Sequence, residues 1–262
     1  MKIGFIGGGN MAEAMIKGMR SHGMKGIFVS EPLEERNAYL QKTYNTSTVK
    51  TNKELVSSCR IIILAIKPQN MDAVLDEIKE TVTEEHTVVS IAAGIKLDHL
   101  TSRLKTKKLI RVMPNTPALV QEGMSVMSLC ECFSDNDIAV VRDILMSIGK
   151  VATLPEKHMD AVTAISGSGP AFIALFVEAM IESAETIGLN KDDASTLAVQ
   201  TLLGTSKLLD SGMDPVRLRE MVTSPGGTTA AGLAVFDEKK FKDTVKAAII
   251  AARNRSEELG RS

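Results

Sequence analysis

The chain has 262 residues, and its 31 Lys and Arg are balanced by 32 Asp and Glu. A net charge near zero argues against a surface built for nucleic acid or for an anionic membrane, because both are recognised largely through charge. Hydrophobic residues make up 44% of the chain, which excludes a disordered protein and suits one large domain or two smaller ones.

No targeting or membrane-spanning segment is predicted. The first seven residues are too short and too rich in glycine for a signal peptide. The longest charge-free stretch, 161–177, is shorter than the roughly 20 residues of a membrane span, and we interpret it as the start of a deeply buried helix. Cys59, Cys130 and Cys132 have neither metal nor disulfide spacing, so we interpret them as small buried residues of a cytoplasmic protein.

Before Pro155, short apolar runs alternate with amphipathic stretches of helix length. Runs that are apolar throughout indicate strands buried on both faces, and helices between them indicate parallel crossovers. The predicted strands span 3–6, 27–29, 61–66, 88–91, 109–113, 124–129 and 151–154. The predicted helices span 11–21, 33–42, 71–82, 97–104 and 135–148. This alternation predicts an α/β domain, 1–155, with a mostly parallel sheet and helices on both faces.

After Pro155 only helical patterns remain, at 171–187, 192–210, 215–222, 229–236 and 240–259. We therefore predict an all-α C-terminal domain, 156–262. Residues 171–181 read AFIALFVEAMI, which is apolar nearly all round, so this helix needs cover on every side. A second copy of the chain can supply that cover and would make a homo-oligomer; the alternative is cover by the N-terminal domain alone.

Residues 7–12 read GGGNMA, which fits the pattern G-x-G-x-x-A. The motif follows a predicted buried strand and opens an amphipathic helix, as a dinucleotide-binding fingerprint of Rossmann type requires. Gly7 permits a tight turn, Gly9 lets the backbone approach a pyrophosphate, and Ala12 allows close packing. The alternative is a tight turn with no ligand.

The tip of the second predicted strand gives conflicting signals about the cofactor. Ser30 and Arg36 suit the 2′-phosphate of NADPH, whereas Glu31 suits the free ribose hydroxyl of NADH. We expect both cofactors to be used, with NADPH modestly preferred.

Several unusual segments follow predicted strands: AIKP at 65–68, AAG at 92–94 and PNTP at 114–117. The ends of parallel strands share one edge of the sheet, where the ligand crevice of such folds forms. Lys67 is either a functional cation or a solvated surface lysine.

Two Gly-rich segments precede helices of the second half, SGSGP at 166–170 and SPGGTT at 224–229. Open backbone at a helix N-terminus binds anions, and a carboxylate fits the second segment better than a phosphate because the loop has no Lys or Arg. The alternative is a turn with Thr as the helix cap. The sequence shows no Ser–His–Asp set, and no lysine follows a Gly-rich segment as a β-hydroxyacid dehydrogenase would need.

These motifs together resemble the pyrroline-5-carboxylate reductase family from end to end. The resemblance includes GFIGGGNMA at 4–12, AIKPQ at 65–69, VSIAAG at 89–94, RVMPNTPA at 111–118 and SGSGPA at 166–171, and SPGGTT is its most specific part. It implies NAD(P)H-dependent reduction of the C=N bond of 1-pyrroline-5-carboxylate to L-proline, the last step of proline biosynthesis. It also implies an intertwined homodimer, with a substrate site where the helical domain of a second subunit meets the nucleotide domain, and assembly of dimers into a ring.

The resemblance assigns site residues as well. Thr229 would be catalytic, through a hydroxyl that faces the ring nitrogen. The substrate carboxylate would be held by Val222, Gly227, Thr228 and Thr229. The cofactor would be held by Gly7, Gly8, Gly9, Asn10, Met11, Ala12, Ser30, Asn52, Ala65, Ile66, Lys67, Pro68, Ala93 and Asn115. No metal is expected. A protonated cyclic imine is already electrophilic, so its reduction needs orientation more than a catalytic base.

Two other functions stay open. One is a reductase on the same plan that acts on a 3-hydroxyacid or a deazaflavin, which would be marked by a catalytic Lys or a different carboxylate loop. The other is a catalytically silent protein that binds a dinucleotide and regulates, which would be marked by loss of Gly9 or of the 227–229 segment.

Overall fold

The computed structural model describes residues 1–130 and 135–260. The chain divides into two compact units: Met1–Ser168 together with Ala252–Ser262, and Gly169–Ala251. The predicted division at 155/156 falls ahead of this one, and the C-terminal residues return to the first unit. Cys132 lies outside the described residues, while Cys59 is buried and Cys130 is half-buried.

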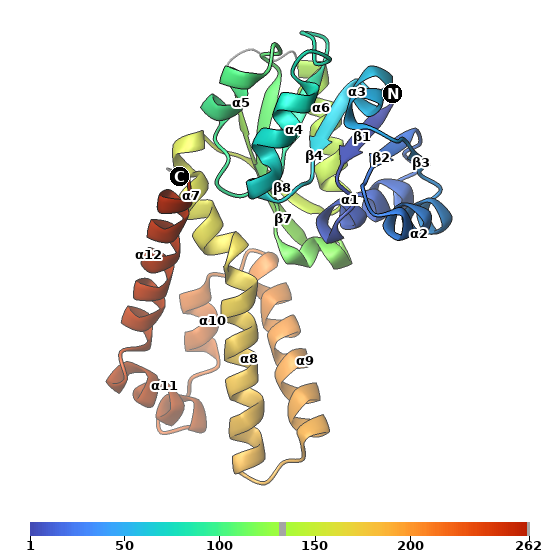
Figure 1. The fold of residues 1–262 in the computed structure, drawn as a ribbon. Helices are drawn as coiled ribbons and strands as arrows, with labels where there is room; N and C mark the ends of the chain where they lie inside the picture. The colour runs from blue at the N-terminus through green and yellow to red at the C-terminus, as the bar shows by residue number, and fades with distance from the viewer. Residues whose placement is uncertain (131–134, 261–262) are drawn as a thin grey trace. The chain divides into compact units, whose positions relative to one another are not determined.

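Within its described residues, the first unit contains an eight-stranded sheet in the order β3-β2-β1-β4-β5-β6-β7-β8 (Figure 1). All neighbouring strands are parallel except β6 and β7, which are antiparallel. The strands are β1 Ile3–Ile6, β2 Ile27–Ser30, β3 Ser47–Thr48, β4 Ile61–Leu64, β5 Thr87–Ser90, β6 Leu109–Met113, β7 Gly123–Leu129 and β8 Gly149–Thr153. This confirms the predicted α/β class with its mostly parallel sheet.

Helices pack on both faces of this sheet, which explains why the central strands β1 and β4 are apolar and buried throughout. Along β4, Ile61 and Ile63 join the core beneath α1 and α6, whereas Ile62 and Leu64 join the core beneath α3, α4 and α5. The helices of this unit are α1 Asn10–Ser21, α2 Glu34–Tyr44, α3 Asn52–Ser58, α4 Met71–Ile78, α5 Leu97–Arg103, α6 Asp135–Met146 and α7 Met159–Val162. Short helical turns are η1 Pro68–Asn70, η2 Thr116–Val120, η3 Glu156–His158 and η4 Thr163–Gly167, of which η4 is a π-helix.

Strand β3, helix α3 and the four-residue helix α7 are absent from the sequence prediction, because all three are too short to carry a periodic apolar signal. Strand β3 has two exposed residues, Ser47 and Thr48, and pairs only with β2. Helix α3 has seven residues and begins with a cap instead, since the Thr51 side chain accepts a hydrogen bond from the Glu54 N–H at 3.1 Å.

The second unit is helical, as predicted. It contains α8 Gly169–Thr186, α9 Lys191–Asp210, α10 Pro215–Met221, α11 Thr228–Glu238 and the first part of α12 Phe241–Leu259. Helices α8 and α9 lie side by side (Figure 1). Caps set several of these boundaries: the Asp214 carboxylate accepts from the N–H groups of Val216 and Arg217, and Pro215 occupies the first helical position.

Helix α8 is not buried within the single chain, so the cover expected for it has to come from outside this chain. None of its residues is buried, and Ile173, Leu175 and Phe176 are exposed by 50%, 64% and 39%. The segment Glu156–Thr186 is also long and apolar enough to cross a membrane, by length and composition alone. A soluble helix with this surface needs cover from outside the chain.

Candidate functional site

The predicted dinucleotide loop lies where the strand order of the sheet reverses. Strand β1 has β2 on one side and β4 on the other, and Ile6 is in register with both Ser30 and Leu64. The chain leaves β1 at Gly7 and enters α1 at Asn10. Open α/β sheets form their ligand crevice outside the strand ends at such a reversal point.

The geometry of this loop requires glycine at one position and leaves space at another. Gly7 has φ +96°, and a Cβ there would lie 2.5 Å from the Ala65 carbonyl oxygen. Gly9 is the N-cap of α1 with φ −66°, and a Cβ there would meet nothing within 4 Å. The first N–H groups of α1 have no backbone partner in the described part of the chain, and the space beside Gly9 is open, which fits the pyrophosphate of a dinucleotide.

These two glycines make a matched pair for mutation. Gly7→Ala should destabilise the fold by about 1–3 kcal/mol, because alanine is strained at positive φ and collides with backbone. Gly9→Ala should keep the stability of the cofactor-free protein and raise the Kd for NAD(P)H, because only the ligand approaches this position. Urea unfolding and cofactor titration of both variants measure the two effects; equal stability losses would contradict this separation.

The residues expected near the adenosine are brought together. Ser30 is buried at the end of β2, and its hydroxyl donates to Asn52 Oδ1 at 2.7 Å. Asn52 opens α3, and its Nδ2 donates to Glu77 Oε2 at 2.7 Å. The sequence analysis did not identify Glu77 of α4, because the amphipathic pattern of this helix does not indicate which of its acidic side chains faces α3.

Glu31 and Arg36 also lie at the loop, and both bond to Gly8, so Arg36 is not free to receive a 2′-phosphate as the NADPH hypothesis expected. The Glu31 carboxylate accepts the Gly8 N–H at 2.7 Å. The Arg36 Nε donates to the Gly8 carbonyl at 2.6 Å, and its Nη2 pairs with Glu13 at 2.5 Å. With the Ser30 hydroxyl bonded to Asn52, the two side chains expected to receive a 2′-phosphate already have partners.

The segments after β4, β5 and β6 line the same edge of the sheet. The Ala65 N–H donates to the Ile6 carbonyl at 2.8 Å, which fixes the first of these segments beside β1. Lys67 is exposed just ahead of η1, which leaves both interpretations of it open. Pro68 and Ala93 line one cavity of about 990 Å³.

Asn115 connects two of the predicted motifs. Its Oδ1 accepts the Met124 N–H at 2.8 Å, and its Nδ2 donates to the Ser166 carbonyl at 3.1 Å. Ser166 lies in η4, the π-helix, and its hydroxyl oxygen is buried with no partner among the described residues. Single π turns within helices occur frequently at functional sites. The SGSGP segment is thus held at the end of β6.

The end of α12 is a part of this edge that the sequence did not indicate. Ser256, Leu259 and Gly260 line the same cavity as Pro68 and Ala93. The buried Ser256 hydroxyl donates to Asp160 Oδ1 at 2.7 Å, which ties α12 to α7. A contact between residues as far apart in the chain as Asp160 and Ser256 cannot be predicted from a local sequence pattern.

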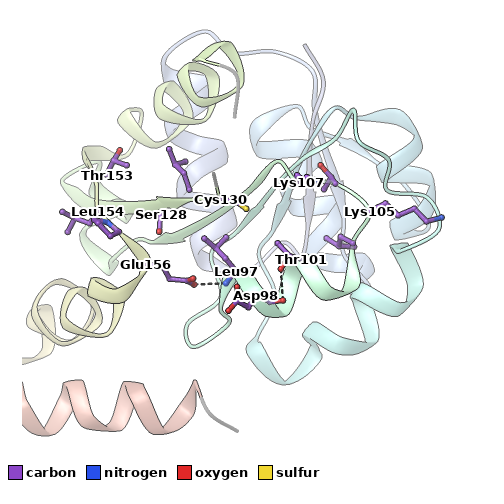
Figure 2. Close-up of a pocket in the computed structure, with 14 residues that line it drawn as sticks. Leu97, Asp98, Thr101, Lys105, Lys107, Ser128, Cys130, Thr153, Leu154 and Glu156 are labelled. Atoms are coloured by element: carbon purple, nitrogen blue, oxygen red, sulfur yellow. Dashed lines mark hydrogen bonds between the residues drawn. The ribbon is translucent and has the colours of Figure 1, made fainter. Parts of the chain in front are cut away.

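A second cavity, of about 860 Å³, contains none of the predicted site residues (Figure 2). It lies toward the opposite edge of the sheet, between α5 and the last strands, and its lining includes Lys105, Lys107 and Ser128. Glu156 Oε1 closes one side by accepting from the Leu97 N–H at 2.8 Å and from the buried Arg111 at 3.0 Å. The two cavities share Asp98 in their linings, but this one touches none of the residues predicted to bind cofactor or substrate.

The predicted carboxylate segment lies in the second unit, at the start of α11. Gly227 is its N-cap, and the Gly227 N–H donates to the Ser224 carbonyl at 3.0 Å within the turn, so it is not free as expected. The N–H groups of Thr228 and Thr229 have no backbone partner in the described part of the chain. The Thr229 side chain is half-buried, while Thr228 is exposed and Val222 ends α10 with 55% exposure.

Known proteins resemble this chain over its whole length. A pyrroline-5-carboxylate reductase of Synechocystis is 38% identical, covering 100% of this chain and 99% of the relative. The chain belongs to the pyrroline-5-carboxylate reductase family. Residues 156–259 match the family model of pyrroline-5-carboxylate reductase dimerisation, and residues 2–94 match the model described as NADP oxidoreductase, coenzyme F420-dependent.

Solved structures of other pyrroline-5-carboxylate reductases share the fold. The enzyme of Coxiella burnetii superposes with a TM-score of 0.94 at 31% identity, covering 100% of this chain and 99% of that one. The pyrroline carboxylate reductase of Plasmodium falciparum, solved with NADP bound, has a TM-score of 0.89 at 32% identity over 99% and 98%. As a member of this family, the chain is an NAD(P)H-dependent oxidoreductase and a homo-oligomer with a C-terminal dimerisation domain.

Proposed function

We propose that the residues described above carry out the reaction of the family as follows. The chain reduces the C=N bond of 1-pyrroline-5-carboxylate to L-proline, the last step of proline biosynthesis. Residues 1–155 bind the dinucleotide, and residues 156–262 serve dimerisation and substrate binding. The observation that carries the proposal is a Gly-rich loop at the strand-order reversal, on the same chain as a helix start whose Thr228 and Thr229 N–H groups have no backbone partner among the described residues, in a member of this family.

The cofactor, when bound, supplies the hydride for the imine carbon. The N–H groups of Thr228 and Thr229 hold the substrate carboxylate, since neither has a backbone partner among the described residues at the start of α11. The Thr229 hydroxyl meets the ring nitrogen and keeps the imine in one orientation. Because the protonated imine is electrophilic, this orientation is the main contribution that the substrate residues make.

The cofactor is held by the loop 7–12, with Ser30 and Asn52 at the adenosine and 65–68, Ala93 and Asn115 on the nicotinamide side. Both NADPH and NADH are used, with NADPH preferred. The NADP bound to the Plasmodium relative supports the use of NADP(H). Because Arg36 is bonded to Gly8 and Glu13, we do not attribute this preference to Arg36.

Glu31 should oppose that preference. Glu31→Gln removes a negative charge at the Gly8 N–H and should raise kcat/KM for NADPH more than for NADH, because only NADPH places a phosphate near the ribose 2′ position. Steady-state kinetics with the two cofactors at saturating imine measure the ratio. A ratio equal to that of the wild type would show that Glu31 does not face the ribose.

The dimers assemble further into a ring in a cytoplasmic enzyme. The exposed apolar surface of α8 lies inside the matched dimerisation segment, so we attribute it to contact between subunits and not to lipid. The function is tested by following oxidation of NADPH and NADH with and without 1-pyrroline-5-carboxylate. Oxidation that depends on the imine supports the proposal, and oxidation at the same rate without it contradicts the proposal.

A further inference from the structure

Arg36 joins helix α2 to the dinucleotide loop and to helix α1 at once. Its Nε donates to the Gly8 carbonyl at 2.6 Å, and its Nη2 pairs with Glu13 at 2.5 Å. The side chains of Arg36 and Glu13 are exposed by only 23% and 19%, so solvent screens this ion pair less than a typical surface pair.

Glu13 is itself held in place by two tyrosines of α2. Its Oε1 accepts from the Tyr44 hydroxyl at 2.8 Å and from the Tyr39 hydroxyl at 2.9 Å. Burial raises the pKa of Glu13, but hydrogen bonds from Arg36, Tyr44 and Tyr39 together hold this pKa below its ordinary value. The Arg36 guanidinium also lies over the Tyr39 ring, 5.1 Å from its centroid. The arginine is therefore fixed by contacts on several sides.

The other polar group of Gly8 is held as well, because its N–H donates to Glu31 Oε2 at 2.7 Å. Side chains thus restrain both ends of the central residue in a run of three glycines. Glycine has the largest conformational freedom to lose, so a glycine loop needs such external contacts to present one conformation. A loop that is ordered in advance binds its ligand with a smaller entropy cost.

We infer that Arg36 and Glu13 are positioning residues that hold the dinucleotide loop in its binding conformation, and that Arg36 is not a ligand of the 2′-phosphate. This rests on the proposed cofactor site at residues 7–12. The two roles make different demands: a phosphate ligand acts on NADPH alone, whereas a loop restraint acts on NADPH and NADH equally.

The test compares Arg36→Met and Glu13→Gln with Glu35→Gln, a control at an exposed position of α2. Binding of each reduced cofactor to the substrate-free enzyme is followed by the cofactor's own fluorescence. Loss of a hydrogen bond to a charged group should raise the Kd of Arg36→Met for both cofactors by at least about tenfold. The ratio of the two Kd values should stay that of the wild type, and Glu35→Gln should change neither.

A second measurement needs no cofactor. Amide hydrogen exchange of the segment containing Gly8 should be faster in Arg36→Met and Glu13→Gln than in the wild type and the control. Glu13→Gln keeps the size of the side chain, so it answers the same question if Arg36→Met does not fold.

Three results would overturn the inference. A loss of affinity confined to NADPH would make Arg36 a phosphate ligand. If Arg36→Met and Glu13→Gln change neither the cofactor Kd values nor the amide exchange at Gly8, then Arg36 and Glu13 do not hold the loop. If Gly9→Ala leaves the Kd for both NADPH and NADH unchanged, the cofactor does not bind at this loop. That result would overturn the proposed cofactor site and the inference with it.

Discussion

Thr229→Ala should lower kcat/KM for 1-pyrroline-5-carboxylate by about 10–150-fold, the effect of losing a hydrogen bond to a charged group worth about 1.5–3 kcal/mol. The substrate is small, so few contacts orient it, and the hydroxyl beside the ring nitrogen is one of them. Part of the loss should appear in kcat, because this contact strengthens as the hydride arrives. Steady-state kinetics at saturating cofactor measure both parameters.

Thr228→Ala is the matched control for this prediction. It keeps the backbone N–H that holds the carboxylate and removes an exposed hydroxyl, so it should cost much less. Cofactor affinity should be the same in both variants, because the residues proposed to bind the cofactor all lie before residue 116. If Thr229→Ala and Thr228→Ala lower kcat/KM by the same small factor, Thr229 serves only the start of α11. The substrate would then bind elsewhere.

Phe176→Asp should abolish the dimer and lower solubility. Phe176 lies on α8, where it is 39% exposed in the single chain and close to Phe241, with ring centroids 6.3 Å apart. In a dimer interface the new carboxylate would be buried without a partner, which costs several kcal/mol and leaves the apolar surface of α8 uncovered. Light scattering measures the mass, and Glu178→Gln, at an exposed position of the same helix, should remain a dimer. A soluble, active monomer of Phe176→Asp would contradict the assignment of α8 to the subunit contact.

The sequence predicts the elements of this fold where the burial pattern repeats along the chain. The continuous apolar run at β4 and the alternation of strands and helices are direct consequences of a sheet covered on both faces. Strand β3 and helix α3 lack that pattern, because one is a short polar edge and the other is stabilised by its cap. The antiparallel pairing of β6 and β7 depends on the path of the connection at η2, which no periodicity reveals.

For the candidate site, too, the sequence identifies residues that the backbone conformation requires but not contacts that depend on tertiary packing. Gly7 and Gly9 are identified by their spacing, because the backbone conformation that the loop requires restricts the residue type. The partners of side chains are set by tertiary packing, so the sequence could not show that Arg36 faces Gly8 and Glu13, or that the Gly227 N–H is used within its own turn. The return of residues 252–260 to the first unit has the same cause.

The central claim is that this enzyme delivers a hydride to the C=N bond of 1-pyrroline-5-carboxylate. The most direct measurement uses NADH or NADPH deuterated at the transferable position of the nicotinamide and analyses the product by mass spectrometry and NMR. We predict L-proline with one deuterium on the ring carbon that was doubly bonded to nitrogen, formed in equal amount to the cofactor oxidised. Cofactor oxidation without labelled proline, or a label on another carbon, would contradict the account.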